Sequence, residues 1–260
     1  MPQSMETVSS ADGATIAYVR SGSGPALVIV NGALSTKESA VSLAPLLDSD
    51  FTLYRYDRRG RGDSSDGDAY APELEVQDLA AMLRATEEAP FVFGQSSGGA
   101  LALEAAATGV EMRGLFVHEP PYVPGPGTAR ETANELADLV ARGNRDEAVE
   151  RFLRSTGVPD AGLAQMRASP VWQPLLDLAH TLPYDVRLLN EGRVPTERLG
   201  QVPCPVLATT GSLSAPWALD AVRAVAAAVP DGEYRTLDDQ AHTVAPDVLA
   251  SLLRERFGTR

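Results

Sequence analysis

Short apolar runs alternate with longer helical patterns along most of this 260-residue chain, and no other feature constrains the fold as strongly. Apolar residues fill every position of Ala26–Val30, as expected for a strand that is covered on both faces of a parallel sheet. The intervening helical patterns would supply the two covering layers, so the sequence predicts a mainly parallel α/β sheet with helices on both faces. The predicted strands after the N-terminal region are Ala26–Val30, Phe51–Tyr56, Phe91–Phe93, Leu115–Val117, Val206–Thr210 and Glu233–Leu237. The helical patterns between and after them are Thr36–Leu47, Pro72–Glu88, Ser97–Thr108, Trp217–Val229 and Asp247–Phe257.

Two regions depart from this alternation. At the N-terminus, Met5–Ser10 and Thr15–Arg20 flank a turn and predict an antiparallel hairpin, which brings the predicted sheet to eight strands. Residues 122–203 show helical patterns and no convincing strand. We therefore predict a core formed by residues 1–121 and 204–260, with residues 122–203 inserted as a helical cap (lid). The helices predicted in the cap are Thr128–Ala141, Arg145–Ser155 and Val171–Leu182.

Composition excludes several classes of protein. The formal net charge of −13 argues against a general nucleic-acid binder, because phosphate backbones require a positive face. The N-terminal residues lack the basic and apolar stretches of a signal peptide, and the longest apolar runs are far too short to cross a bilayer. We therefore expect a cytoplasmic protein that binds neither nucleic acid nor a membrane. Cys204 and the three histidines lie far apart, so they give no local metal-site spacing.

The strongest local signal for chemistry is the segment Gly94–Gly98, which has the form G-x-S-x-G. It directly follows the predicted strand Phe91–Phe93 and directly precedes a predicted helix, which is the setting of a nucleophile elbow. So tight a turn requires small residues on both sides of the nucleophile, and Gly94 and Gly98 meet this need. The turn would lift the Ser96 hydroxyl to a helix N-terminus, where developing negative charge is stabilised. An ordinary glycine-rich turn is the alternative.

Together with three further segments, this motif resembles the α/β-hydrolase superfamily over nearly the whole chain. Val28–Ala33 resembles the end of the third strand, whose loop provides half of the oxyanion hole, although many members have His where Asn31 stands. Tyr56–Ser64 resembles the D-x-R-G-x-G-x-S loop, and Asp238–Val244 resembles the loop that carries the catalytic histidine, here His242. The resemblance implies an α/β-hydrolase fold and a Ser–His–acid triad.

Ser96 needs a base within hydrogen-bond reach, because a serine hydroxyl is a poor nucleophile at neutral pH. His242 is the best of the three histidines, since it follows the last predicted strand and allows the chain order Ser, acid, His. His180 lies in a helical pattern of the cap, and we expect it to be structural or to line the pocket. His118 ends a predicted strand and is expected to pack against the sheet.

The acid of the triad departs from the common family pattern. Its usual position follows the strand Val206–Thr210, but residues 211–216 contain no carboxylate. Glu119 stands at the end of the preceding strand, where some α/β-hydrolases, including lactone hydrolases resembling the zearalenone-degrading type, place a glutamate. Parallel strand ends lie side by side, so this longer side chain can reach the same imidazole. We therefore predict Glu119 as the acid. The alternatives are Asp220, Asp238 and Asp239.

The predicted oxyanion hole consists of the backbone N–H groups of Ser97 and Ala33. Asn31 and Gly32 would shape the second of these loops and are candidates for contact with substrate. We interpret the nearby charged residues mainly as a buried ion-pair network, with a substrate role for either arginine as the alternative. These residues are Asp57, Arg58 and Arg61. Four aromatic residues are candidates for the substrate-binding rim, with plain core packing as the alternative: Tyr122, Trp172, Tyr184 and Trp217.

The sequence therefore predicts a serine hydrolase that cleaves a carboxylic ester, lactone or thioester of a small, fairly apolar molecule through an acyl-enzyme. Such a reaction needs no metal and no cofactor. The negative net charge favours a neutral substrate. A homodimer is the default expectation for the oligomeric state, because most soluble oligomers are symmetric dimers. The alternatives are C–C bond hydrolysis or a lyase or cyclase reaction on the same scaffold, a catalytically silent small-molecule binding protein, and an interaction protein that docks through its lid.

Overall fold

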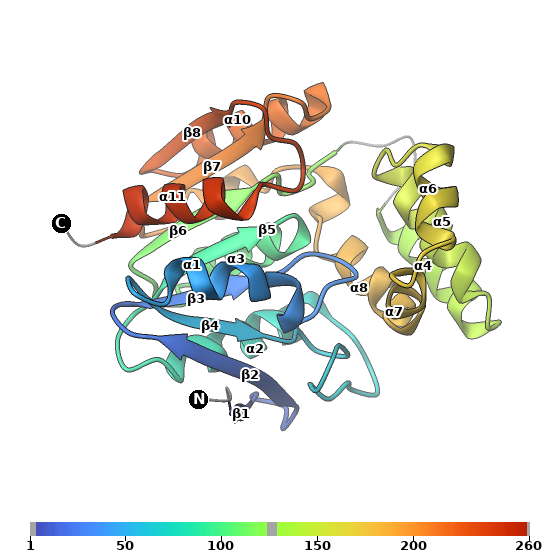
Figure 1. The fold of residues 1–260 in the computed structure, drawn as a ribbon, viewed down its shortest axis with the longest axis horizontal. Coiled ribbons are helices and arrows are strands. Elements are labelled where there is room, and N and C mark those ends of the chain that lie inside the picture. The colour runs from blue at the N-terminus through green and yellow to red at the C-terminus, as the bar shows by residue number, and fades with distance from the viewer. Residues whose placement is uncertain (1–3, 124–128, 259–260) are drawn as a thin grey trace.

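The computed structural model describes residues 4–123 and 129–258. The strands in this part of the chain form one eight-stranded sheet, in the order β1-β2-β4-β3-β5-β6-β7-β8 (Figure 1). β2 pairs antiparallel with both β1 and β4, and all the other neighbouring pairs are parallel, which confirms the predicted mainly parallel sheet. The strands are β1 (Met5–Ser9), β2 (Thr15–Gly22), β3 (Ala26–Val30), β4 (Thr52–Tyr56), β5 (Phe91–Gln95), β6 (Gly114–His118), β7 (Val206–Gly211) and β8 (Gly232–Leu237).

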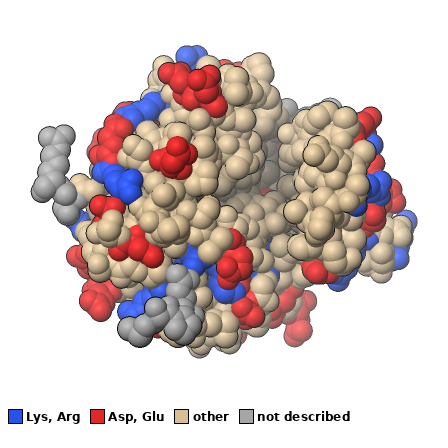
Figure 2. Space-filling model, viewed as in Figure 1, with Lys and Arg blue, Asp and Glu red and all other residues tan. Residues whose placement is uncertain are grey.

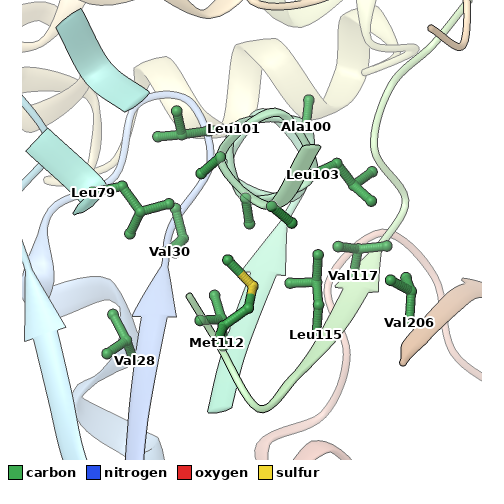
Figure 3. Packing of buried hydrophobic residues seen from close by; sticks show 14 of the residues in the cluster. Val28, Val30, Leu79, Ala100, Leu101, Leu103, Met112, Leu115, Val117 and Val206 are labelled. Carbon is green, nitrogen blue, oxygen red and sulfur yellow. The ribbon is translucent and has the colours of Figure 1, made fainter. Parts of the chain in front are cut away.

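The side chains of β3 alternate between two hydrophobic cores. Val28 and Val30 belong to the core on one face of the sheet, where they lie with Leu101 (Figure 3), whereas Leu27 and Ile29 belong to the core on the opposite face. Successive strand residues point to opposite faces, so a continuous apolar run requires a cover on each side. The first core is covered by α2 (Pro72–Arg84), α3 (Ser97–Ala107) and α10 (Pro216–Ala228), and the second by α1 (Ala44–Leu47) and α11 (Pro246–Phe257).

The prediction of one helix over Thr36–Leu47 is wrong in detail. Lys37–Leu43 forms a 3-10 helix, η1, and the short helix α1 follows with Pro45 in its first turn. Proline has no N–H to donate to the preceding turn, which explains why the two helices are distinct. The helix predicted over Pro72–Glu88 is confirmed but ends at Arg84.

Between β6 and β7 the described residues form helices and no strand. Most of these helices pack around an apolar cluster of their own, which includes Leu136, Val149 and Trp172. They lie beyond the carboxyl ends of the parallel strands (Figure 1), as a cap on the sheet would. The single helix predicted over Val171–Leu182 is wrong in detail, because two separate helices span these residues, and the sequence patterns did not predict the helices that cover 160–167, 182–187, 190–192 and 196–199. The helices are α4 (Ala129–Ala141), α5 (Arg145–Ser155), α6 (Asp160–Arg167), α7 (Trp172–Asp177), η2 (Ala179–Thr181), α8 (Leu182–Arg187), η3 (Asn190–Gly192) and α9 (Thr196–Leu199).

The surface is hollowed between the sheet domain and the cap. Figure 2 shows this hollow, and few charged residues line it on the face in view. No helix in residues 4–123 or 129–258 is both long and apolar enough to span a membrane.

Candidate active site

Ser96 occupies a strained turn between β5 and α3. Its backbone has φ 55° and ψ −130°, a conformation that a residue with a side chain rarely adopts. A Cβ atom on Gly98 would lie 2.2 Å from the Val30 carbonyl oxygen, and one on Gly94 would lie 2.7 Å from the Gly99 Cα, so both positions exclude larger residues. The strand–turn–helix context predicted from the sequence is therefore present. The Ser96 side chain is half-buried, which leaves it open to a ligand.

The loop after β3 approaches the same serine. A Cβ atom on Gly32 would lie 2.9 Å from the Ser96 Cβ and 3.4 Å from its Oγ, so only glycine allows this approach. The Asn31 side chain donates a hydrogen bond to the Thr36 carbonyl (2.9 Å) and so holds the loop from within. The Asn31 side chain therefore has a structural role in this loop. Ala33, two residues later, packs against the apolar cluster of the cap.

Glu119 and His242 form a short hydrogen bond. His242 Nδ1 lies 2.7 Å from Glu119 Oε2, while Glu119 Oε1 accepts hydrogen bonds from the Thr210 hydroxyl (2.8 Å) and the Gly211 N–H (2.9 Å). The Glu119 side chain is only 1% exposed and that of His242 is 48% exposed. A residue buried at the end of β6 therefore contacts an imidazole that is open to solvent.

The environment of Glu119 keeps it ionised. Burial by itself raises the pKa of this carboxyl, but the hydrogen bonds from His242 and the Gly211 N–H outweigh that effect and lower the pKa to about 2. A carboxylate only accepts hydrogen bonds, so His242 Nδ1 carries the proton. In the neutral form of this imidazole the other ring nitrogen, Nε2, has a free lone pair, as a general base requires.

The alternative acids do not share this position. Asp220 lies on the exposed side of α10, and Asp238 and Asp239 are exposed in the loop after β8. Within the described residues none of the three forms a hydrogen bond or ion pair with His242, whereas Glu119 does. The sequence allowed four carboxylates, and the geometry favours Glu119.

A buried ion-pair network lies beside the elbow and reaches into the cap. Arg58 Nε donates to Glu75 Oε2 (2.7 Å), and Arg58 Nη1 donates to Asp185 Oδ1 (2.8 Å). Arg61 Nη2 donates to the second oxygen of Asp185, Oδ2 (2.8 Å), and Ser97 Oγ donates to Asp185 Oδ1 (2.6 Å). All of these side chains are buried. The carboxylate of Asp185, on α8, thus joins the cap to the residue that follows Ser96.

The same two arginines hold the loop after β3. Arg61 Nη1 donates to the Gly32 carbonyl (2.9 Å), and Arg58 Nη1 lies 3.3 Å from the Asn31 carbonyl. Burial lowers the pKa of Arg58, but Glu75 and Asp185 outweigh it and hold that pKa well above the usual value. Both guanidinium groups are therefore paired with buried protein groups, with only Arg61 Nε left without a hydrogen bond in the described part of the chain, which agrees with the interpretation of Arg58 and Arg61 as a structural network. Asp57 belongs to a second buried pair, 2.7 Å from Lys37 Nζ.

Asp185→Asn is expected to lower the free energy of unfolding by about 3–5 kcal/mol. The change leaves Arg58 paired only with Glu75 and leaves the buried guanidinium group of Arg61 without a carboxylate. Urea unfolding followed by circular dichroism measures this change. The matched control is Asp160→Asn, which breaks an exposed ion pair with Arg154 and is expected to cost about 0–1 kcal/mol. Equal losses in the two variants would contradict the role given to the network.

The four candidate aromatic residues occupy different environments. Tyr122 is buried in the core beneath α3, and Trp172 is buried in the apolar cluster of the cap, where its Nε1 donates to Asp146 (3.2 Å). Tyr122 and Trp172 are therefore core residues, which was the alternative to a place on the substrate-binding rim. Tyr184 stacks on Tyr70 with 4.0 Å between ring centroids, so it contributes to cap docking. Trp217 is half-buried in the first turn of α10.

The remaining titratable candidates have structural partners. His180 Nε2 contacts the Gly60 carbonyl (2.9 Å), a bond between the cap and the loop after β4. Cys204 is buried, and burial raises the pKa of its thiol. Across residues 4–123 and 129–258, no group of three or more His, Cys, Asp or Glu side chains is arranged to hold a metal ion.

Comparison with known proteins gives a consistent result. Residues 27–252 match the model of a family described as "Alpha/beta hydrolase family". The chain is 44% identical in sequence to an alpha/beta hydrolase from Sphaerobacter thermophilus whose crystal structure is known. The two structures superpose with a TM-score of 0.91, and the alignment covers 97% of this chain and 100% of that one. It shares its fold with an esterase from Thermogutta terrifontis (20% identity, TM-score 0.77, 97% of each chain). An enol-lactonase from Burkholderia xenovorans is similar in the same way (17% identity, TM-score 0.73, 96% of this chain and 98% of that one).

Curated relatives match over shorter segments. A pyrrolizixenacetamide deacetylase from Xenorhabdus hominickii is 37% identical over 100 residues, which is 36% of each chain. An uncharacterized hydrolase from Bacillus subtilis is 27% identical over 148 residues, 55% of each chain. These alignments span about a third to just over half of the relatives' lengths.

Proposed function

Because the chain belongs to the alpha/beta hydrolase family, we propose that it is a serine hydrolase acting on a carboxylic ester, lactone or thioester of a small, uncharged molecule. The observation that carries the proposal is the 2.7 Å contact between His242 Nδ1 and the buried carboxylate of Glu119. This contact places the proton of the neutral imidazole on Nδ1 and leaves Nε2 as the base. The backbone carbonyl of His242 also accepts a hydrogen bond from the side chain of Gln95, the residue before Ser96. The proposed nucleophile, acid and base follow β5, β6 and β8, all at the carboxyl ends of the parallel strands.

In the proposed reaction the Ser96 Oγ attacks the substrate carbonyl carbon, while His242 Nε2 removes the hydroxyl proton. The N–H groups of Ser97 and Ala33 stabilise the resulting oxyanion. The protonated imidazole then gives its proton to the leaving oxygen or sulfur, and an acyl-enzyme forms on Ser96. A water molecule, deprotonated by His242, releases the acid and restores the serine. Among the described residues the Ser96 hydroxyl makes no hydrogen bond, so its approach to Nε2 is part of the proposal.

Three observations favour an uncharged substrate. Arg58 and Arg61, the cations beside the elbow, are already paired with Glu75 and Asp185. The hollow between the sheet domain and the cap has few charged residues on the face seen in Figure 2. The net charge of −13 would also repel anions. Esterases, an enol-lactonase and a deacetylase stand among the similar proteins, which supports acyl transfer as the reaction class.

A fluorophosphonate probe tests the nucleophile, because it forms a stable adduct with an activated serine. We expect one adduct per chain, on Ser96. The tryptic peptide of residues 85–113 contains both Ser96 and Ser97, so fragment ions must assign the site. No adduct on Ser96, under conditions that label a known serine hydrolase, would contradict the proposal.

A substrate panel of short-chain esters, lactones and thioesters then defines the substrate class. Each neutral ester is paired with a half-ester of the same length that carries a free carboxylate, and the neutral member is expected to have the higher kcat/KM. A preference for the anionic members would contradict the proposed uncharged substrate while leaving the nucleophile assignment intact.

A further inference from the structure

We propose that Gln95 and His118 are positioning residues that fix the loop carrying His242, so that its imidazole keeps its alignment with Ser96. The inference rests on the proposed function, because it assigns these two side chains a role in that reaction. Neither residue contacts the reacting atoms in the mechanism above. Each acts through the backbone of the loop, Gln240–His242.

Three consecutive carbonyl groups of this loop accept hydrogen bonds from three neighbouring strand ends. The Gln240 carbonyl accepts from the Leu213 N–H, just after β7 (2.9 Å). The Ala241 carbonyl accepts from His118 Nε2 at the end of β6 (3.1 Å), and the His242 carbonyl accepts from Gln95 Nε2 at the end of β5 (2.8 Å). The loop is thus held at every residue from Gln240 to His242.

The register of the sheet explains why these two side chains act together. Gln95 and His118 are paired across β5 and β6, so they lie side by side at the same level of the sheet. Each precedes a proposed catalytic residue, Gln95 before Ser96 and His118 before Glu119. Each strand end therefore supplies one member of the triad and, one position earlier, one hydrogen bond to the loop that carries the third.

The hydrogen bonds of His118 define its protonation. A backbone carbonyl only accepts, so Nε2 must carry the proton that bonds to Ala241, and Nδ1 then accepts from the Thr209 hydroxyl (2.9 Å). His118 is fully buried, and burial lowers its pKa to about 4. The neutral imidazole with this arrangement is therefore retained at neutral pH, even though Glu119 lies 3.7 Å away.

Hydrogen bonds rather than buried side chains hold this loop, and on either side of it the Asp239 N–H donates to Ser212 Oγ (2.9 Å) and the Ala245 N–H to Gln240 Oε1 (2.8 Å). Ala241, His242 and Thr243 are exposed, so no buried apolar side chain ties the loop down between Leu237 and Val244. The position of the imidazole is then set by its bond to Glu119 and by the hydrogen bonds to its own backbone. A shift of about 1 Å at a reacting group can cost about 100-fold in rate.

The test compares variants that remove one donor each. Gln95→Leu and His118→Leu are expected to lower kcat by about 10- to 100-fold with KM changed less than about threefold, because the loop moves and the substrate site does not. His118→Gln, whose amide can donate from the same place, is expected to recover most of kcat. The matched control is Gln173→Leu, which removes an exposed glutamine–aspartate bond on the cap and is expected to leave kcat unchanged.

A second readout does not depend on turnover. Hydrogen exchange followed by mass spectrometry is expected to show faster exchange in peptides covering residues 238–245 in both leucine variants, and no change there in Gln173→Leu. Urea unfolding identifies any variant with a global loss of stability. If His118→Leu does not fold, Gln95→Leu still decides the test, because Gln95 is only partly buried.

The outcomes separate this inference from the proposed function. If the native chain forms the Ser96 adduct and turns over an ester, while folded Gln95→Leu, and His118→Leu where it folds, keep native kcat, the positioning role is overturned and the hydrolase function stands. If the native chain forms no Ser96 adduct, the proposed function itself fails. A lowered kcat that His118→Gln restores supports the inference.

Discussion

Ser96→Ala is expected to lower kcat by about 10⁵- to 10⁶-fold, because the covalent route through the acyl-enzyme is lost. Alanine keeps the Cβ of serine, so it adopts the same backbone and preserves the elbow between β5 and α3. The hydrolysis of the best ester from the substrate panel measures the loss. The remaining rate reports what the oxyanion hole and substrate binding contribute without a nucleophile.

The matched control for this variant is Ser155→Ala. Ser155 is exposed at the end of α5 and donates only to the Phe152 carbonyl of its own helix, so this change is expected to leave kcat and probe labelling intact. Ser96→Ala is expected to abolish the fluorophosphonate adduct as well. Turnover of Ser96→Ala within tenfold of the native rate, or an adduct on another serine, would show that the nucleophile lies elsewhere.

Glu119→Gln is expected to lower kcat by about 10⁴-fold, because an amide selects the wrong tautomer of His242. The amide nitrogen can donate to Nδ1, which places the imidazole proton on Nε2, where it cannot receive the proton of Ser96. The amide also lacks the charge that stabilises the protonated imidazole. Steady-state turnover at pH 7 measures the loss, with folding checked by circular dichroism.

The alternative acids provide the controls for Glu119. Asp238→Asn and Asp239→Asn are expected to keep kcat within about threefold, since both side chains are exposed and unbonded to His242. If one of them instead lost activity while Glu119→Gln kept it, the acid would be that aspartate.

The same glutamate gives stability a defined pH dependence. Its pKa is about 2 in the folded protein and is ordinarily near 4.5, so the unfolded chain binds the proton more readily. The stabilisation it provides is present above about pH 4.5 and is lost as the pH falls towards about 2. The free energy of unfolding of the native chain should therefore fall more steeply over this range than that of Glu119→Gln.

The sheet was predictable because burial on two faces leaves a plain sequence pattern. Ala26–Val30 is apolar at every position, and it forms the central strand β3 between the two cores. Short helices between β6 and β7, such as α9, span about one turn, and Thr196–Leu199 is too short to show a period. The break between η1 and α1 depended on a single proline at position 45.

The candidate site could be proposed from the sequence where its side chains stand in local motifs. Ser96 and His242 stand in such segments, and Glu119 was indicated by the lack of a carboxylate in residues 211–216. Asp185 gave no signal, because it meets Arg58 and Arg61 across more than 120 residues. In the loop that carries His242, the partners of Gln95 and His118 are backbone carbonyls, which no residue identity reveals.

The buried carboxylate on α8 also divides the cap into parts that differ in how freely they can be exchanged. A transplant that replaces residues 129–178 with the corresponding helices of a relative leaves Asp185 in place between Arg58 and Arg61. A transplant that extends through Leu182–Arg187 removes the partner of both arginines, unless the donor brings an aspartate to the same point. Exchange of the cap is therefore constrained at α8 by a buried charge, and over residues 129–178 only by the need to preserve the apolar cluster shared with Leu182 and Val186.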